Sequence, residues 1–318
     1  MAEDLSRRIR VSKAKLSDGQ PTDKAKLSAH KPPEIEHLDD WISAREAEFP
    51  DIRAGLAKAI VWADPEAKSR TKLSIVSVHG FSASRGEVYP LAEIVARALG
   101  ANLFYTRLAG HGRSGDAMAE ATVDLWKQDM TEALAIGDRI GEKVLVIATS
   151  TGATLAIGAL SYPEIASRVT AAAFLSANMR LRSRGAWLLT VPFAGYITRL
   201  LIGRRRGFSP LNALHAAYWT TDYPVKALLP MARLVKSVGD VEYESIDVPA
   251  LFIHSAQDAV VDASAASAAA RRWGGTVEII DPGAVDDPYH HVVAGDALSP
   301  STTIVLAEKI AKWFNKII

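Results

Sequence analysis

The segment from Lys143 to Ile157 (K-V-L-V-I-A-T-S-T-G-A-T-L-A-I) constrains the fold more than any other part of this 318-residue chain. A run of aliphatic residues stops there, and small residues that suit a helix follow. The pattern predicts a buried strand, a sharp turn and a helix, with Ser150 at the turn. Residues two before and two after such a serine must be small, and here they are Ala148 and Gly152. Taken alone, Ser150 fits a helix-capping residue as well as it fits a nucleophile.

Apolar strands alternate with helical stretches through most of the chain. The predicted strands are Ala57 to Ala63, Lys72 to Val78, Ala101 to Thr106, Lys143 to Thr149, Val169 to Leu175, Pro249 to His254 and Thr276 to Ile280. The predicted helices are Glu34 to Phe49, Tyr89 to Leu99, Ala119 to Ile140, Ala263 to Trp273 and about Thr302 to Phe314. Because the strands are apolar nearly throughout, they predict a mostly parallel, doubly wound sheet with helices on both faces, an α/β fold.

The alternation breaks between Asn178 and about Asp247, where helix-forming and aromatic residues are frequent and no convincing strand is found. We expect this insertion, residues 178–247, to form a helical cap (lid) above the strand ends, and residues 51–177 and 248–318 to form the core. Residues 1–50 are expected to form a basic arm and a short helix. Through Lys31 the arm carries eight Lys or Arg against four Asp or Glu. We interpret it as a solvated segment, with a contact to an anionic partner or membrane surface as the alternative.

Composition narrows the classes of function. The chain has no cysteine, which excludes disulfides, thiolate catalysis and cysteine-bound metals. A net charge of +1 gives no general attraction to nucleic acid. No apolar signal segment is visible at the N-terminus, so we expect a cytoplasmic protein. The most hydrophobic later stretch, Ala186 to Ile202, is interrupted by Pro192, Gly195 and Arg199, and we expect no transmembrane segment.

A nucleophilic serine needs a base, and the base needs an orienting carboxylate. Asp258 follows the predicted strand P-A-L-F-I-H, and His290 and His291 follow the strand T-V-E-I-I. Functional groups gather at the carboxyl ends of strands in an open α/β sheet. The chain order of serine, acid and histidine is the one expected of an α/β-hydrolase arrangement.

Each candidate also has a purely structural interpretation. Asp258 could accept hydrogen bonds from loop amides, and Asp262 is a rival acid four residues on. The adjacent histidines could bind a metal with Asp286 or Asp287, although neighbouring side chains seldom converge on one ion. Three candidates in the right order, each just beyond a predicted strand, favour catalysis over these alternatives.

Backbone amides could stabilise the oxyanion of a tetrahedral intermediate. Thr151, directly after Ser150, supplies one amide, and Phe81 in the H-G-F stretch after a buried strand supplies the second. Gly80 allows the close approach of backbone to substrate. His79 is then interpreted as a structural hydrogen-bonding residue.

The stretches H-G-F-S-A-S, R-L-A-G-H-G-R-S-G, A-T-S-T-G, the Asp258 loop and H-H-V-V-A-G-D together resemble the α/β-hydrolase superfamily. Within it, the spacing is similar to bacterial carboxylesterases and monoacylglycerol lipases with a helical cap, over about Ala57 to Ile318. The resemblance implies that Ser150 is the nucleophile and Asp258 the acid, and that the amides of Phe81 and Thr151 form the oxyanion hole.

For the base, the family pattern is a small residue and a histidine followed by V-x-x-x-D, which fits His291 to Asp296. His291 is therefore chosen, with His290 as the alternative base. The chain departs from the family pattern at two positions. Ala148 replaces the usual first glycine of the serine motif, and His290 occupies the small position.

These residues predict a serine hydrolase that cleaves carboxylic esters, of the acyl ester or monoacylglycerol type, through an acyl-enzyme. The aromatic and aliphatic cap residues favour a small-molecule ester with an apolar acyl chain. No metal or cofactor is required. The alternatives are a carbon–carbon bond or thioester hydrolase with the same triad, and a non-catalytic α/β-hydrolase-like binding protein. The sequence does not indicate the oligomeric state.

Overall fold

The computed structural model describes residues 31–182, 185–191 and 194–318. The chain divides into two units, Met1–Lys31 and Pro32–Ile318, and all that follows concerns the second unit. The predicted basic arm lies almost entirely outside the described residues. None of the helices in the described ranges combines the length and the apolar character needed to cross a membrane.

A seven-stranded sheet forms the centre of the unit, in the order β1-β3-β2-β4-β5-β8-β9. The strands are β1 (Ala59–Val61), β2 (Thr71–Val78), β3 (Asn102–Tyr105), β4 (Gly141–Thr149), β5 (Val169–Leu175), β8 (Ala250–Ile253) and β9 (Val277–Ile280). All neighbouring pairs are parallel except β1 with β3. The predicted mostly parallel α/β sheet is therefore confirmed, with an antiparallel strand at one edge.

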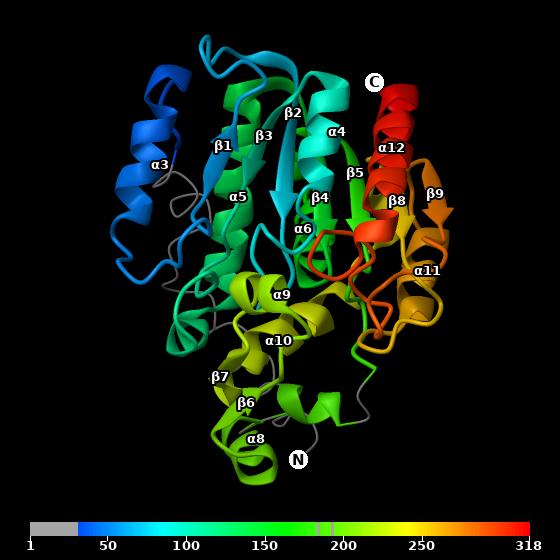
Figure 1. Ribbon diagram of the computed structural model, residues 1–318. Coiled ribbons are helices and arrows are strands. Elements are labelled where there is room, and N and C mark those ends of the chain that lie inside the picture. Colours follow the sequence, from blue (N-terminus) through cyan, green and yellow to red (C-terminus); the bar gives the residue numbers. More distant parts are fainter. Residues whose placement is uncertain (1–30, 183–184, 192–193) are drawn as a thin grey trace, which may run out of the picture. The chain divides into compact units, whose positions relative to one another are not determined.

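Helices cover both faces of this sheet (Figure 1). They are α3 (Leu38–Glu46), α4 (Leu91–Leu99), α5 (Val123–Ile140), α6 (Thr151–Leu160), α7 (Pro163–Ala166), α11 (Ala263–Arg271) and α12 (Pro300–Ile317). Alternate residues of a strand point to opposite faces. Accordingly, Ile75 of β2 packs in one buried cluster with α4 and α12, and Val76 packs in the other with α5, α6 and α11.

Helix ends follow local capping signals. Gly100 ends α4 with φ of +60°, a left-handed conformation that suits glycine. The helix predicted from Ala119 begins instead at Val123, because the Thr122 side chain accepts a hydrogen bond from Leu125 N at 3.1 Å and caps it. A short 3₁₀ helix, η3 (Asp116–Glu120), occupies the start of the predicted range.

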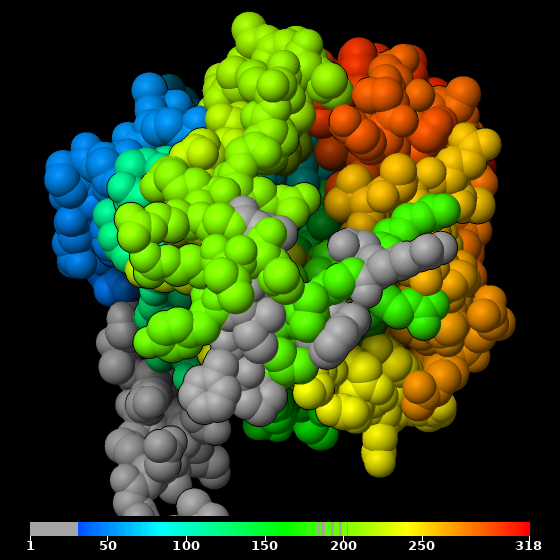
Figure 2. Space-filling model, turned by 90° about the horizontal axis from the view of Figure 1, so that it is seen from below, coloured from blue at the N-terminus to red at the C-terminus, as the bar shows by residue number. Residues whose placement is uncertain are grey.

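The insertion at residues 178–247 lies at the end of the sheet where the parallel strands finish (Figure 1). Seen from that end, its light green part occupies the middle of the face, between α3 and the C-terminal region (Figure 2). Its elements are η4 (Ala186–Thr190), α8 (Ala194–Ile202), β6 (Arg205–Gly207), α9 (Ala213–Tyr218), β7 (Asp222–Pro224), η5 (Val225–Ala227), α10 (Leu228–Val238) and η6 (Tyr243–Ser245).

The expectation that this insertion has no strand was wrong. Strands β6 and β7 pair antiparallel over three residues each, and Arg205 forms an ion pair with Asp222 across the ribbon. All three residues of β6 are exposed, so no buried apolar face marks it in the sequence.

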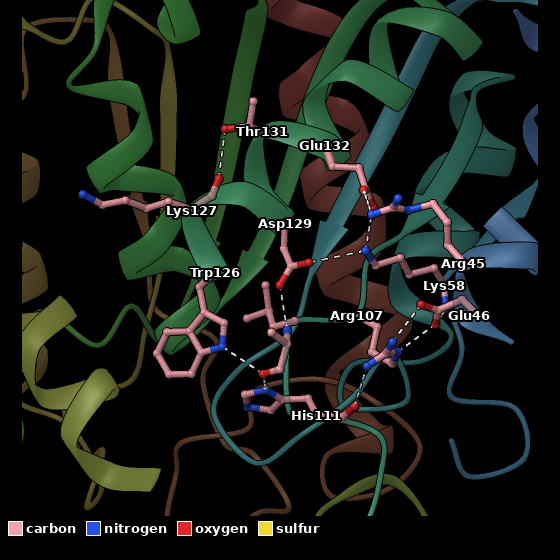
Figure 3. Close-up of polar contacts among 12 residues, drawn as sticks. Arg45, Glu46, Lys58, Arg107, His111, Trp126, Lys127, Asp129, Thr131 and Glu132 are labelled. Atoms are coloured by element: carbon pink, nitrogen blue, oxygen red, sulfur yellow. Dashed lines mark hydrogen bonds and ion pairs between the residues drawn. The ribbon is translucent and has the colours of Figure 1, made fainter. Parts of the chain in front are cut away.

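A buried network of charges ties α3 and β1 to the loop after β3 (Figure 3). Arg107 donates to both carboxylate oxygens of Glu46, at 2.7 and 2.8 Å. Lys58 lies 2.6 Å from Glu132 and 3.4 Å from Asp129, and Asp129 also accepts from Ala109 N at 2.7 Å. Buried charges are costly unless they are paired, so breaking any of these contacts would be unfavourable. The network therefore holds the loop after β3 in place.

Candidate active site

Ser150 occupies a strained turn between β4 and α6. Its φ of +50° and ψ of −118° lie outside the regions that L-residues prefer. A Cβ added at Gly152 would come within 2.4 Å of His79 O, so only glycine fits two residues after the serine. Ala148 is fully buried and pairs with β2 and β5, which shows that a methyl group fits two residues before it.

The turn brings Ser150 to His291 and, through it, to Asp258. His291 Nε2 lies 3.0 Å from Ser150 Oγ, and His291 Nδ1 lies 2.8 Å from Asp258 Oδ2. A carboxylate only accepts hydrogen bonds, so Nδ1 donates and Nε2 is left to accept the serine hydroxyl proton. Ser150 is the N-cap residue of α6 but its side chain makes no capping hydrogen bond. Its hydroxyl is therefore not used as a helix cap.

Asp258 makes the contacts expected for both of its interpretations. It is fully buried, and its second oxygen, Oδ1, accepts from Val260 N at 2.8 Å and Val261 N at 2.9 Å. The loop amides thus hold the carboxylate while Oδ2 contacts His291. The rival acid Asp262 instead caps α11 through Ser264 N.

His290 and His291 differ sharply in surroundings. His290 has φ of +54°, and among the described residues its Nδ1 is buried without a hydrogen-bond partner. Glycine adopts this left-handed conformation most easily because it has no Cβ, although histidine tolerates it better than most other residues. Of the two rings, only that of His291 is hydrogen-bonded to Ser150.

Charges around His291 favour its protonated form. Burial alone lowers the pKa of His291, but the hydrogen bond and charge of Asp258 outweigh it, with further contributions from Glu87 and Asp287. The net result is a pKa raised above the usual histidine value. A raised pKa makes the imidazole a stronger proton acceptor.

Two residues that sequence patterns did not reveal hold the His291 backbone. Asp287 Oδ2 accepts from His291 N at 3.0 Å and Val292 N at 2.8 Å. Ser176 Oγ donates to His291 O at 2.6 Å. The sequence indicated Asp287, as an alternative to Asp286, only as a metal ligand beside the two histidines. Asp286 accepts from Ser301 N. Across the described ranges, no group of three His, Asp or Glu residues is arranged to hold a metal ion.

The H-G-F loop lies beside Ser150. A Cβ added at Gly80 would come within 3.0 Å of Ser150 Cβ, so glycine is needed for this close approach. Within the described part of the chain, the N–H groups of Phe81 and Thr151 donate no backbone or side-chain hydrogen bond. Both amides are therefore available to an acceptor such as a substrate oxygen.

His79 fixes this loop from behind. Its Nε2 accepts from Leu108 N at 3.1 Å, so its Nδ1 donates to Gly80 O at 2.9 Å. Burial lowers the pKa of His79 to about 4, and the ring is neutral near pH 7. Both ring nitrogens are occupied, as expected of a structural histidine.

The insertion contacts the same loop. Thr220 N donates to Ser82 O at 2.7 Å, and the Tyr223 ring meets the Phe81 ring edge to face with centroids 5.4 Å apart. Trp219 packs in a small buried cluster with Ala83 and Val292. Apolar side chains of the insertion thus border both the H-G-F loop and the histidine loop.

Ser150 lies at a strained turn between a strand and a helix, and the acid and the histidine follow later strands of the same mostly parallel sheet. This arrangement is typical of one class of α/β protein. The chain belongs to the alpha/beta hydrolase family, whose model matches residues 75–296. That range contains Ser150, Asp258 and His291.

Solved structures share this fold at low sequence identity. One, from work on the metagenome-derived lipolytic enzymes LipS and LipT, is 19% identical with a TM-score of 0.63 over 83% of this chain and 99% of that chain. A soluble monoglyceride lipase variant from Saccharomyces cerevisiae, solved with a substrate analogue, is 11% identical with a TM-score of 0.62 over 82% and 90%. A monoacylglycerol lipase from Paleococcus ferrophilus is 12% identical with a TM-score of 0.60 over 83% and 99%. No curated protein sequence gives a significant match.

Proposed function

We propose that this chain is a serine hydrolase that cleaves carboxylic esters, with Ser150 as nucleophile, His291 as base and Asp258 as the orienting acid. The hydrogen-bond chain from Asp258 through His291 to Ser150 carries the proposal. It supplies a nucleophile, a base in the correct tautomer and a buried negative charge that stabilises the imidazolium.

The reaction proceeds through an acyl-enzyme. His291 Nε2 takes the hydroxyl proton as Ser150 Oγ attacks the ester carbonyl, and the carbonyl oxygen becomes an oxyanion. The N–H groups of Phe81 and Thr151 donate to that oxygen, and the positive end of α6 adds to the stabilisation. The intermediate then collapses, and His291 returns the proton to the leaving alcohol. Water, deprotonated by His291, attacks the acyl group and releases the acid and Ser150.

The proposed substrates are acyl esters of the monoacylglycerol type, with residues 178–247 acting as a cap over the site. The apolar contacts of Tyr223 and Trp219 around the Phe81 and Val292 loops support a site suited to an acyl chain. The likeness in fold to monoglyceride and monoacylglycerol lipases points in the same direction.

A substrate panel tests this function and separates it from the alternatives. Purified wild-type protein and Ser150→Ala are compared on short esters, long esters, monoacylglycerols and acyl-thioesters. We expect ester turnover by the wild type and a loss of about 10³-fold or more in Ser150→Ala, with unchanged thermal unfolding. A preference for acyl-thioesters over esters would support a thioester hydrolase instead. Folded wild type that is inactive on every substrate would overturn the ester hydrolase and leave a carbon–carbon bond hydrolase or a binding protein.

A further inference from the structure

Glu87 is a buried carboxylate that the proposed reaction does not use. It belongs to the segment that connects β2 to α4, and only 3% of its surface is exposed. Its Oε2 accepts a hydrogen bond from Gly80 N at 2.6 Å. Gly80 directly precedes Phe81, whose N–H is a proposed oxyanion donor. Glu87 therefore holds the backbone at the point where the donor must be placed.

Glu87 also lies against the histidine loop. A Cβ added at Gly295, in the loop that follows His291, would come within 2.5 Å of the backbone oxygen of Glu87. A Cβ added at Gly80 would come within 2.8 Å of Glu87 Oε1 and 3.0 Å of Ser150 Cβ, so the carboxylate lies beside the residue that His291 contacts. Burial raises the pKa of Glu87 to about 7, and the Gly80 hydrogen bond and the His291 charge oppose that rise. In return, the Glu87 charge raises the pKa of His291, as do Asp258 and Asp287. Asp258 and Asp287 are thus the other carboxylates whose charge acts on His291.

We propose that Glu87 is a positioning residue with two actions: it fixes the Phe81 amide through Gly80, and its charge adds to that of Asp258 in stabilising protonated His291. The site then has two carboxylates on the imidazole, one in direct contact and one acting through space. This inference rests on the proposed function. A purely structural Glu87 would act through the Gly80 hydrogen bond alone.

The two actions are separated by Glu87→Gln and Glu87→Ala. The glutamine side chain keeps an amide oxygen for Gly80 N but removes the charge, whereas alanine removes both. The readout is kcat and KM for an ester from pH 5 to 9. Asp286→Asn is the matched control, because it removes an exposed carboxylate from the same loop as His291.

The base acts in its neutral form, so kcat/KM falls as pH drops through the pKa of His291. The pKa of Glu87 is itself raised to about 7, so its charge is present mainly on the upper part of the acid limb. Removing that charge lowers the pKa of His291, and we expect the upper part of the acid limb of Glu87→Gln to move to lower pH, by up to about half a pH unit. Asp286→Asn should leave the limb in place because solvent screens its charge. Glu87→Ala should also lower kcat by about tenfold or more with a smaller change in KM, since the oxyanion donor is displaced.

A Glu87→Gln profile that coincides with wild type would overturn the electrostatic action. Unchanged kcat in folded Glu87→Ala would overturn the positioning action. If Glu87→Ala fails to fold, Glu87→Asp decides, because the shorter side chain keeps the charge but loses the present geometry of the Gly80 hydrogen bond. A lowered kcat in Glu87→Asp supports the positioning action, and a wild-type kcat overturns it. Failure of the proposed function itself is distinct: Ser150→Ala would then match wild type, whatever the Glu87 variants do.

Discussion

His291 Nε2 lies 3.0 Å from Ser150 Oγ, although 141 positions separate the two residues in the chain. The contact exists because the loops after β4 and β9 emerge at the same edge of the parallel sheet. It rests on local features at each end: a glycine two residues after Ser150, and an acid in contact with His291. Each feature can be tested by a single substitution.

The two adjacent histidines should differ in their contribution to turnover. His291→Ala should lower kcat by about 10³-fold or more, because the Ser150 hydroxyl loses its proton acceptor. His290→Ala is the matched control and should keep most of the activity. Steady-state ester hydrolysis measures both. A larger loss in His290→Ala than in His291→Ala would exchange their roles.

Asp258 and Asp262, the acids on either side of Val260, should also differ in their contribution to turnover. Asp258→Asn keeps an oxygen for the loop amides but cannot hold the correct His291 tautomer, and we expect kcat to fall by about 10³-fold or more. Asp262→Asn retains a helix-capping side chain and should remain near wild-type activity. Equal losses in the two variants would show that Asp258 has no special role. Circular dichroism confirms that both variants are folded.

Gly152 should not tolerate a side chain. In Gly152→Ala the new Cβ meets His79 O at 2.4 Å, so backbone must shift, with a loss of about 1–3 kcal/mol in unfolding free energy. The movement also displaces Ser150 and should lower kcat. Gly158→Ala, in the same helix, meets only a Val238 methyl group at 3.4 Å. It should be neutral or stabilising by up to about 1 kcal/mol, and urea unfolding compares the two.

The Glu46–Arg107 pair should contribute to stability in a pH-dependent way. Burial raises the pKa of Glu46, but the hydrogen bond and charge of Arg107 outweigh it and lower the pKa below 4.5. The contribution is therefore present above pH 4.5 and is lost as pH falls through the lowered pKa. Glu46→Gln should lower the unfolding free energy by about 3 kcal/mol at pH 7, and less at pH 4.

Glu48→Gln, an exposed neighbour of Glu46, is the control and should change stability little at either pH. Urea unfolding at pH 4 and pH 7 measures both variants. A Glu46→Gln penalty that stays constant across this range would contradict the sign of the pKa shift.

The sequence predicted the core of the fold where strands are long and apolar. Strand β5 has the bounds expected for it, Val169–Leu175, because all its residues except Thr170 are apolar and buried. Strand β1 is shorter than predicted and lies at the edge of the sheet, where it pairs antiparallel with β3. The ribbon of β6 and β7 was missed because three exposed residues carry no periodic signal.

In the site, the sequence identified residues whose type and place after a strand indicate chemistry, such as Ser150 and Asp258. It did not identify Glu87 or Asp287, whose partners are backbone amides that leave no pattern in the residues around them. The choice between His290 and His291 came from family resemblance at the sequence level. Only their positions in space show which ring meets Ser150.

Covalent labelling of Ser150 tests the central claim most directly. Folded wild-type protein is treated with a fluorophosphonate probe, and the adduct is located by intact mass and peptide mapping. We expect one adduct per chain, on Ser150, that is absent in Ser150→Ala and forms much more slowly in His291→Ala. Folded protein that takes up no probe, or that is labelled at another residue while Ser150 stays unmodified, would contradict it.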